Sequence, residues 1–567
     1  MQQKSLNEYI EQIKNLVQSS NYIDCVDLLN NAIKDYPEEN KLKLNLGNIY
    51  KLVGKNNQAI DVYLSLMNSD FSAFANNNLS LIYLELGEYD KSIEHAKNAL
   101  NINSDYHDAK YNLALSLFEK KNYTESLSIA KNLINVESHK AKAYELKIRI
   151  EQLICDWSSY EDTNELLSKN KIIVHPFLHI SHVMDNEKNQ INARYWTNQL
   201  SNNKKDNSFP RPKSKIKLGF LCGEIRNHPT YYLIRNLFKH IDKEIFSVFM
   251  FSYNHNQTEK NEIVQYFTDF VDLDGLDDND ASKCLSDYSL DILIDLTTII
   301  SHNRQSILND NSAKFIISYL AFPGTTGSSL YDFMLTDKTV TPGTQQNYFE
   351  EKFLFLPNTY QVNNGEVNIT EITTRESFGL PADGLILGSL NQSFKLDPVL
   401  FEIWLQIIQK HDNTYLWLLD ENDEMKKNIN NFIGDRIDLK RIIYAKRLDY
   451  PEHLSRIQHI DIALDTRIYN GHTTSIEMIQ SCIPLVTLKG NHFASRVSAS
   501  LLEALNMDEL ITTNIDDYKE TVSSLIENTT MRNKIKNTMR VQLKESSLLD
   551  IRLFAESFQK TILKIFT

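Results

Sequence analysis

Two polar segments of the sequence have the residue types and the spacing to bind an anion. In the first, residues 460–464 are mostly apolar and predict a buried strand, Asn470-Gly471 predicts a turn, and His472-Thr473-Thr474 predicts the start of a helix. Free backbone N–H groups and the positive end of a helix dipole meet at such a point, which suits a phosphate or diphosphate. An ordinary strand–helix connection, capped by Thr473 or Thr474, explains this segment alone equally well.

A second segment of the same form favours the anion site. Residues 385–390 predict a buried strand, the polar residues Asn391, Gln392 and Lys395 follow it, and Asp397-Pro398 predicts a helix with proline at its first position. Open α/β folds bind ligands at the carboxyl edge of a parallel sheet. The two segments therefore predict one phosphate-bearing ligand that lies across that edge.

Four motifs together resemble the O-GlcNAc transferase family, the tetratricopeptide-bearing protein O-glycosyltransferases, in a short form of bacterial type. The motifs are Asn227-His228-Pro229-Thr230, Phe322-Pro323-Gly324-Thr325, Asn391-Gln392 followed by Lys395, and Asn470-Gly471-His472-Thr473-Thr474. They occur in the family's order, and the resemblance covers nearly the whole chain.

The resemblance implies a role for each motif. Gln392 and Lys395 contact the diphosphate of a UDP-sugar, and His472, Thr473 and Thr474 surround its phosphates. Glu477 binds the ribose, while His453 and Arg456, three residues apart and so on one face of a helix, hold the uracil. Leu320 to Gly324, including Pro323, line the sugar pocket.

The resemblance also places His228 at the anomeric carbon. With an unperturbed pKa of about 6.5, a histidine there could act as a general base. A serine hydroxyl is a much weaker acid than imidazolium, so an oxygen of the departing phosphate could instead take the proton late in the reaction. We expect His228 to position the acceptor or the sugar, with base catalysis as the alternative.

Three positions depart from the family pattern. Tyr450 replaces a lysine near the ribose, Tyr231 replaces a residue that shapes the sugar pocket, and residues 299–302 replace a loop that contains glycine. These departures leave UDP as the expected nucleotide and leave the sugar open between GlcNAc, glucose and others.

Composition limits the class of protein. The 567 residues include 42% hydrophobic and 24% charged residues, and the formal charge is −14 with a pI near 5.6. This balance argues against a sequence-independent nucleic-acid binder. No signal sequence or run of about 20 apolar residues occurs, so we expect a cytoplasmic protein without a membrane span. Five scattered cysteines without C-x-x-C pairs indicate neither disulfides nor a zinc site.

The chain length predicts several domains. Residues 1–140 repeat with a period of 33 and then 34 residues, seen at Gly54, Gly87 and Lys121, and so predict about four tetratricopeptide repeats with an acidic, Asn-rich solvated exterior. Residues 141–214 predict a helical transition ending in a polar linker from residue 202.

Apolar, partly β-branched runs then predict buried parallel strands with helices between them, at residues 216–222, 246–251, 290–296 and 315–321 and again at 385–390, 415–419, 441–445, 460–464 and 484–488. The two series predict two Rossmann-like lobes at residues 215–375 and 376–567. The fold class is therefore α + α/β, an α-solenoid followed by a two-lobed GT-B glycosyltransferase whose second lobe binds UDP. One predicted central strand begins at Asp291, close to the expected cleft.

Asp272-Leu273-Asp274 has the form that metal-dependent sugar transferases place beside a diphosphate, but it is far in sequence from both anion-binding segments. We interpret it as a strand end with a solvated loop, and expect neither a metal nor another cofactor, because Lys395 and the helix at His472 can stabilise the leaving group.

The sequence therefore predicts an inverting transferase that moves GlcNAc from UDP-GlcNAc to Ser or Thr of protein acceptors, which the repeats would engage. The alternatives are a related N-glycosyltransferase that moves glucose from UDP-glucose to Asn, and a tetratricopeptide scaffold with an inactive transferase half.

Overall fold

The structure, a computed structural model, describes residues 4–19, 21–197, 209–300, 303–309, 312–363, 365 and 373–566. It divides into two compact units, residues 1–150 and 151–567. The predicted linker residues 202–208, and Ser301 and His302 of the departing loop, lie outside the described residues. Within the described part of the chain, no helix is both long enough and apolar enough to cross a membrane.

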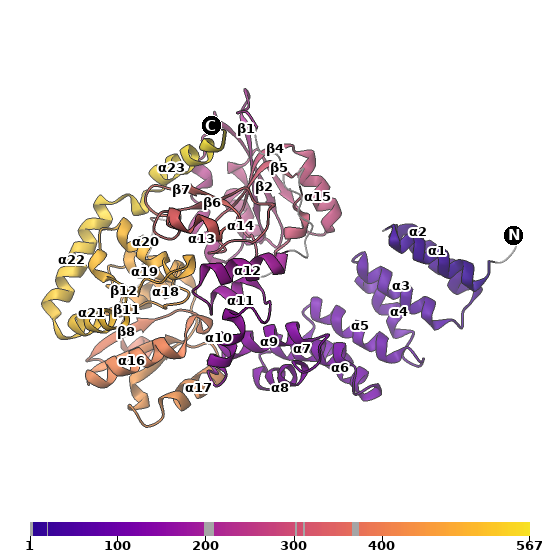
Figure 1. The fold of residues 1–567 in the computed structure, drawn as a ribbon, viewed down its shortest axis with the longest axis horizontal. Helices are drawn as coiled ribbons and strands as arrows, with labels where there is room; N and C mark the ends of the chain where they lie inside the picture. The colour runs from indigo at the N-terminus through magenta and orange to yellow at the C-terminus, as the bar shows by residue number, and fades with distance from the viewer. Residues whose placement is uncertain are drawn as a thin grey trace. The chain divides into compact units, whose positions relative to one another are not determined.

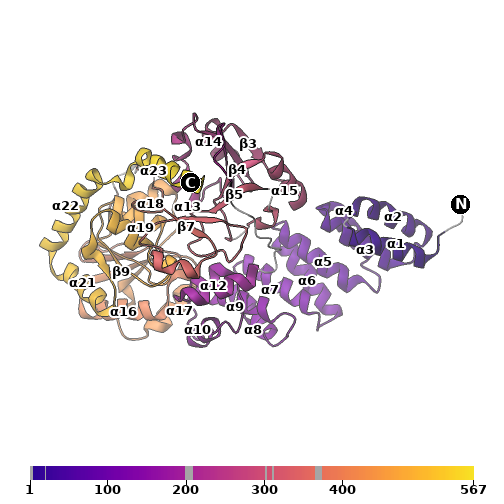
Figure 2. The same cartoon turned by 45° about the horizontal axis from the view of Figure 1, so that its top comes forward.

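The first unit is a row of antiparallel helical hairpins (Figures 1 and 2). Its helices are α1 (Leu6–Gln18), α2 (Tyr22–Asp35), α3 (Asn40–Leu52), α4 (Asn56–Leu64), α5 (Ser72–Glu85), α6 (Tyr89–Ile102), α7 (His107–Glu119), α8 (Tyr123–Leu133) and α9 (Lys140–Leu153), the last of which runs across the division. The four pairs from α1 to α8 confirm the predicted solenoid.

Small residues at the repeating positions let the helices approach closely. Ala59, Ser92 and Ser126 are fully buried, and both serine hydroxyls donate to a carbonyl oxygen of the preceding helix, at Ser80 and Ala114, over 2.6 Å. A larger side chain at these positions would separate the two helices of a hairpin.

The asparagines of α5 and α7 differ from the predicted solvated exterior. Asn76, Asn77 and Asn112 are buried, and the amide of Asn112 donates to Oδ1 of Asn77 over 2.9 Å. These side chains hydrogen-bond neighbouring helices to one another, because a buried amide must find partners inside the protein.

The second unit begins with helices that support the lobes: α10 (Tyr160–Ser168), α11 (Pro176–Ile180) and α12 (Asn186–Thr197). Figures 1 and 2 show α11 and α12 where the two lobes meet. Thr197 donates to the carbonyl oxygen of Gly327 in the first lobe, and the ring of Phe177 packs on Phe394 and Tyr469 of the second. The segment from α10 to α12 therefore contacts both lobes.

The first lobe is built on a parallel sheet of seven strands in the order β3-β2-β1-β4-β5-β6-β7. The strands are β1 (Ile216–Cys222), β2 (Phe246–Ser252), β3 (Asp269–Asp272), β4 (Leu290–Asp295), β5 (Ala313–Ser318), β6 (Phe333–Thr336) and β7 (Lys352–Phe355), and its helices are α13 (Pro229–Ile234), α14 (Gln257–Ile263) and α15 (Asp278–Asp287). Apolar runs buried on both faces form the central strands, as expected for a covered parallel sheet.

The second lobe has a parallel sheet of six strands in the order β10-β9-β8-β11-β12-β13. The strands are β8 (Leu385–Ser389), β9 (Thr414–Leu419), β10 (Ile442–Ala445), β11 (Ile462–Leu464), β12 (Leu485–Leu488) and β13 (Ile511–Thr512). Its helices are α16 (Pro398–Lys410), α17 (Asp423–Ile433), α18 (Tyr450–Ile457), α19 (Thr473–Gln480), α20 (Val497–Ala504), α21 (Ile515–Glu527) and α22 (Thr529–Glu545).

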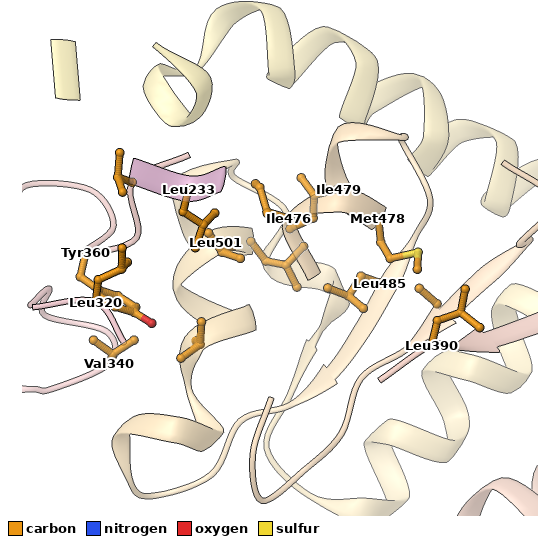
Figure 3. Packing of buried hydrophobic residues seen from close by; sticks show 14 of the residues in the cluster. Leu233, Leu320, Val340, Tyr360, Leu390, Ile476, Met478, Ile479, Leu485 and Leu501 are labelled. Atoms are coloured by element: carbon orange, nitrogen blue, oxygen red, sulfur yellow. The ribbon is translucent and has the colours of Figure 1, made fainter. Parts of the chain in front are cut away.

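One apolar core extends through both lobes. Figure 3 labels members from the first lobe, such as Leu233 of α13 and Tyr360, and members from the second, such as Ile476 of α19 and Leu501 of α20. Because these residues belong to a single buried cluster, the elements that carry the site residues are held by shared packing.

The last helix, α23 (Ile551–Leu563), departs from the predicted second lobe because it packs on β7 in the first. Phe558 is fully buried and stacks on Phe220 of β1, and the side chain of Gln559 accepts from the backbone N–H of Asp242 over 2.7 Å. The chain therefore returns to the first lobe at its end.

Lys121 occupies a conformation that glycine holds in the equivalent turns. Its φ is 61°, against 73° at Gly54 and 74° at Gly87. We expect Lys121→Gly to raise the free energy of unfolding of the solenoid by about 1 kcal/mol, because a side chain is strained in the left-handed region. Chemical denaturation followed by circular dichroism would measure this.

Gly87→Ala is the matched control. No atom lies within 4 Å of an added Cβ at Gly87, so only the backbone conformation opposes the substitution. It should lower the stability by a similar amount, and a stabilising Gly87→Ala would contradict the explanation.

Candidate active site

Most of the predicted site residues lie at the points where the strand order of each sheet reverses. Pro323 and Gly324, which follow β5, and His453 and Arg456, which follow β10, are the exceptions. In the second lobe, Gln392 and Lys395 follow β8 and His472 follows β11, and these two strands are neighbours at the reversal. In the first lobe, His228 follows β1 and the pocket residues Pro323 and Gly324 follow β5. Open α/β sheets bind ligands at this reversal, outside the carboxyl ends of the strands.

Lys395 connects the two ends of the second-lobe site. It closes the short helix η6 (Ser393–Lys395), and its Nζ donates to the carbonyl oxygen of Asn470 over 2.9 Å and lies 4.8 Å from the ring centroid of Tyr469. Burial lowers the pKa of Lys395 to about 8, and the carboxylate of Asp465 opposes this shift. A partly desolvated ammonium of this kind interacts strongly with an added anion.

A buried carboxylate shapes the turn before α19. Oδ1 of Asp465 accepts from the backbone N–H groups of Thr466 and Gly471 over 2.9 and 2.8 Å, and Oδ2 accepts from the hydroxyl of Thr487 over 2.7 Å. Burial raises the pKa of Asp465, whereas these hydrogen bonds and Lys395 favour its charged form. Asp465 was not among the site residues predicted from the sequence, although its position directly after a buried strand could have indicated it.

α19 begins directly after His472, which occupies the N-cap position without a capping hydrogen bond from its side chain. Its Nε2 is shielded from solvent and has no hydrogen-bond partner in the described structure, and burial together with Lys395 lowers the pKa of His472 well below its usual value. A Cβ on Gly471 would lie 2.3 Å from Oγ of Ser475, so only glycine lets the chain enter the helix this closely.

The two anion-binding segments are hydrogen-bonded to each other. The hydroxyl of Thr474 donates to Oδ1 of Asn391 over 2.7 Å, while Thr473 is partly exposed in the first turn of α19. Gln392 is exposed immediately before η6. The structure thus brings Lys395, His472, Thr473 and Thr474 to one place, with Gln392 at its surface.

His453, Arg456 and Glu477 form a network between α18 and α19. Nε and Nη2 of Arg456 lie 3.1 and 2.8 Å from Nδ1 of His453, and Nε2 of His453 lies 3.1 Å from Oε2 of Glu477. Because a guanidinium only donates, Nδ1 must accept and the imidazole hydrogen must be on Nε2. Burial lowers the pKa of Arg456 to about 10, and Glu477 opposes that shift.

His228 is the N-cap of α13. Its Nδ1 accepts from the backbone N–H of Thr230 over 3.2 Å, and its Nε2 lies 3.8 Å from the buried carboxylate of Glu224. Burial lowers the pKa of His228; Glu224 raises it and Arg226 lowers it. The neutral imidazole therefore carries its hydrogen on Nε2, so this nitrogen is a donor.

The loop that contains Pro323 and Gly324 is held by a second buried carboxylate. Oε1 of Glu351 accepts from the backbone N–H of Thr326 over 2.7 Å, and Oε2 accepts from the hydroxyl of Thr325 over 2.8 Å. Burial raises the pKa of Glu351, and these bonds favour its charged form. Both Pro323 and Gly324 are buried.

Two positions noted in the sequence have different surroundings from those expected. Tyr231 points into the core, where its hydroxyl donates to Oε2 of Glu262 over 2.6 Å, and so it does not shape a pocket. Asp291 lies at the amino end of β4, away from the carboxyl edge, and its Oδ2 accepts from the backbone N–H of Lys217 over 2.9 Å. Its role is to join β4 to β1.

An aromatic pair joins the lobes beside the His453 network, and no sequence pattern identified it. The rings of Tyr232 in α13 and Tyr450 in α18 are stacked, with centroids 5.0 Å apart and planes 6° from parallel. Nearby Glu477 is among the groups that raise the pKa of Tyr450, after burial. Tyr450 therefore both contacts the first lobe and borders the network.

Known proteins share this organisation. The profile of glycosyl transferase family 41 matches residues 154–368 and 365–558, and that of the tetratricopeptide repeat matches residues 75–106. A variant of the O-GlcNAc transferase of Thermobaculum terrenum superposes with a TM-score of 0.70 at 18% identity, covering 93% of this chain and 97% of that one. This likeness shows a common fold, helical repeats followed by a two-lobed GT-B unit.

Curated relatives are longer than this chain. A probable UDP-N-acetylglucosamine–peptide N-acetylglucosaminyltransferase, SEC, of Arabidopsis thaliana is 26% identical over 372 residues, covering 64% of this chain and 38% of that protein. A UDP-N-acetylglucosamine–peptide N-acetylglucosaminyltransferase of Caenorhabditis elegans is 22% identical over 420 residues, covering 54% and 36%. The chain thus spans less than two fifths of these relatives. Because the family profile matches well over half of the chain, the protein belongs to glycosyl transferase family 41.

Proposed function

We propose that this protein is an inverting transferase that moves GlcNAc from UDP-GlcNAc to Ser or Thr hydroxyls of protein acceptors. The names of its relatives and its family support a transferase of this class. The observation that carries the proposal is the contact of Lys395 with Asn470, immediately before the N-terminus of α19 at the strand reversal. That position concentrates positive potential where a diphosphate would lie.

The diphosphate contacts Lys395 and the N-terminus of α19, with Thr473, Thr474 and Gln392 as further donors. The buried Nε2 of His472 gains a partner when a phosphate oxygen approaches, since its hydrogen can be placed on this nitrogen. We propose that this arrangement stabilises the leaving group without a metal ion or other cofactor.

The nucleoside lies against the network of His453, Arg456 and Glu477. Oε2 of Glu477 accepts from His453, and we assign the same carboxylate to a ribose hydroxyl. Arg456 and His453 are fixed by each other, so uracil meets side chains whose orientation is set in advance.

In the reaction, the acceptor oxygen attacks the anomeric carbon on the face opposite the diphosphate. The bond from that carbon to the β-phosphate oxygen breaks, UDP leaves with the electron pair, and the configuration inverts. Pro323 and Gly324 border the sugar, and the loop that holds them is fixed by Glu351. His228 donates from Nε2 and so positions the sugar or the acceptor, while a phosphate oxygen takes the hydroxyl proton.

We further propose that the tetratricopeptide repeats engage the protein acceptors and that the protein works in the cytoplasm. The five cysteines are all free, which suits a reducing compartment.

Incubation with UDP-GlcNAc or UDP-glucose and host lysate, followed by mapping of modified residues by mass spectrometry, tests the function. N-acetylhexosamine on Ser or Thr is expected. Hexose on Asn would identify an N-glycosyltransferase instead, and UDP binding without any transfer would identify a scaffold.

Lys395 should make UDP binding depend on pH. Burial holds the pKa of Lys395 at about 8, so the side chain is charged below that pH and neutral above it. UDP affinity should therefore fall above pH 8 by up to tenfold per pH unit. Calorimetric titration between about pH 7 and 9.5 would measure this. Lys395→Ala should also lower transfer about 10²–10³-fold.

Lys395→Arg is the matched control, because arginine remains charged across this range. Its UDP affinity should be independent of pH between about 7 and 9.5, whatever its absolute value. A fall above pH 8 in both proteins would mean that another group titrates.

His228→Ala should lower kcat/KM about 10–10³-fold, while His228→Asn should recover part of the loss, because asparagine can cap α13 and donate a hydrogen bond. The acidic limb of the kcat/KM profile should persist in His228→Asn. Loss of that limb, without recovery, would indicate a general base.

Removal of residues 1–136 should leave UDP binding unchanged and reduce modification of full-length acceptor proteins. The cut precedes α9, which begins at Lys140 and so stays whole. A short acceptor peptide serves as the control and should be modified equally by both proteins. Equal modification of full-length acceptors would assign the repeats to another partner.

A further inference from the structure

A cluster of one histidine and two carboxylates lies at the carboxyl ends of β2 and β3 in the first lobe, and none of its residues belongs to the proposed transferase site. β2 and β3 run parallel with Ser252 opposite Asp272, so both strands end together at the edge of the sheet. His255 follows β2, Asp272 ends β3, and Asp274 lies two residues further on. The topology thus joins His255 to the Asp-x-Asp segment that the sequence alone suggested was only a solvated loop.

Backbone hydrogen bonds turn one oxygen of each carboxylate toward the histidine. Oδ1 of Asp272 accepts from the N–H of Asp274 over 2.9 Å, and Oδ1 of Asp274 accepts from the N–H of Asn254 over 2.7 Å. The two Oδ2 atoms are left facing His255, 3.4 Å from Nε2 for Asp272 and 3.5 Å from Nδ1 for Asp274. Such outer contacts fix the orientation of metal ligands in known sites.

The imidazole of His255 is buried, and its Nδ1 has no hydrogen-bond partner in the described structure. Only 6% of the side chain is exposed, its ring packs edge-on against Phe270, and Nδ1 is shielded from water. A buried polar atom in this state costs free energy. A ligand that accepts the lone pair of Nδ1 would remove that cost.

We propose that His255, Asp272 and Asp274 bind a zinc ion. Three ligand atoms, one from each residue, lie within 4.8 Å of one another, and tetrahedral zinc with bonds of 2.0–2.1 Å needs neighbouring ligand atoms about 3.3 Å apart. One imidazole nitrogen with two carboxylate oxygens is a donor set that zinc accepts. The aspartates are about half exposed, so water completes the fourth position.

Binding uses the tautomer with hydrogen on Nε2, which leaves Nδ1 free to coordinate beside Oδ2 of Asp274. The half-exposed carboxylate of Asp272, whose Oδ2 lies beside Nε2, must turn toward the ion to complete the set. The ion links the loop after β2 to the end of the edge strand β3. Its ligands lie at or just after the ends of β2 and β3 at one edge of the first lobe's sheet, and none of them belongs to the proposed transferase site.

Lys260 is the competing cation. Its Nζ lies 3.4 Å from Oδ2 of Asp272 and from Nε2 of His255, longer than a usual hydrogen bond. The ammonium therefore neutralises part of the carboxylate charge without occupying a good binding geometry. Removing this charge should strengthen zinc binding.

Zinc titration of the dialysed, tag-free full-length chain against a chromophoric chelator tests the proposal. We expect one tight zinc ion per chain, at least 100-fold weaker binding in His255→Ala and Asp274→Asn, and several-fold tighter binding in Lys260→Ala. The matched control is Asp280→Asn, an exposed acidic residue of the same region, which should bind zinc as the unaltered chain does.

X-ray absorption at the zinc edge gives an independent measurement, with one nitrogen and otherwise oxygen ligands expected. The proposal is overturned by the absence of stoichiometric zinc, by unchanged affinity in His255→Ala, Asp274→Asn or Lys260→Ala, or by a sulfur ligand. Circular dichroism of each metal-free variant checks that it folds. If His255→Ala does not fold, Asp274→Asn still tests the site, because asparagine preserves the shape of the side chain.

Discussion

Buried carboxylates fix the loops at the carboxyl edges of both sheets. Asp465 organises the turn before α19, Glu351 organises the loop through Gly324, and Asp295 accepts from the N–H groups of Thr297 and Thr298 over 2.9 Å. Burial raises the pKa of all three, because a charge in a protein interior loses its hydration. A buried carboxylate keeps its charge only where several N–H or O–H groups donate to it. This requirement sets the loop geometry before any ligand binds.

The same segments are supported from behind by apolar packing. Phe177 of α11 contacts Phe394, next to Lys395, and Tyr469, next to Asn470, with ring centroids 5.5 and 5.4 Å apart. The helical segment between solenoid and lobes is thus part of the anion-binding structure. Rigid support of this kind holds the donors where developing charge can use them.

The sequence predicted the elements with strong patterns and missed those defined by tertiary structure. Apolar runs identified β1, β2, β4 and β8–β12, whereas no range was predicted for β3, β6, β7 or β13. The predicted strand 315–321 stops at Ser318, because Leu320 takes a positive φ of 76°. Motifs located Lys395, His472 and the His453 network, since those positions follow strands or share a helix face.

Contacts between distant segments had no local signal. The outward direction of Tyr232 and the inward direction of Tyr231 depend on where α13 begins, which His228 and Pro229 set. His255 meets Asp272 only because β2 and β3 are paired in register. Such relations follow from the packed sheet, which a single sequence does not display.

The return of α23 to the first lobe makes completion of that lobe wait for a segment that follows the second lobe. Phe558 fills the core beside Phe220, and Gln559 contacts the carbonyl oxygen of His240, 319 residues earlier. Such long-range contacts form late, since a large loop must close first. During synthesis, β1 to β7 leave the ribosome before α23, which covers part of their apolar face, so the two lobes complete their cores together rather than in the order of the sequence.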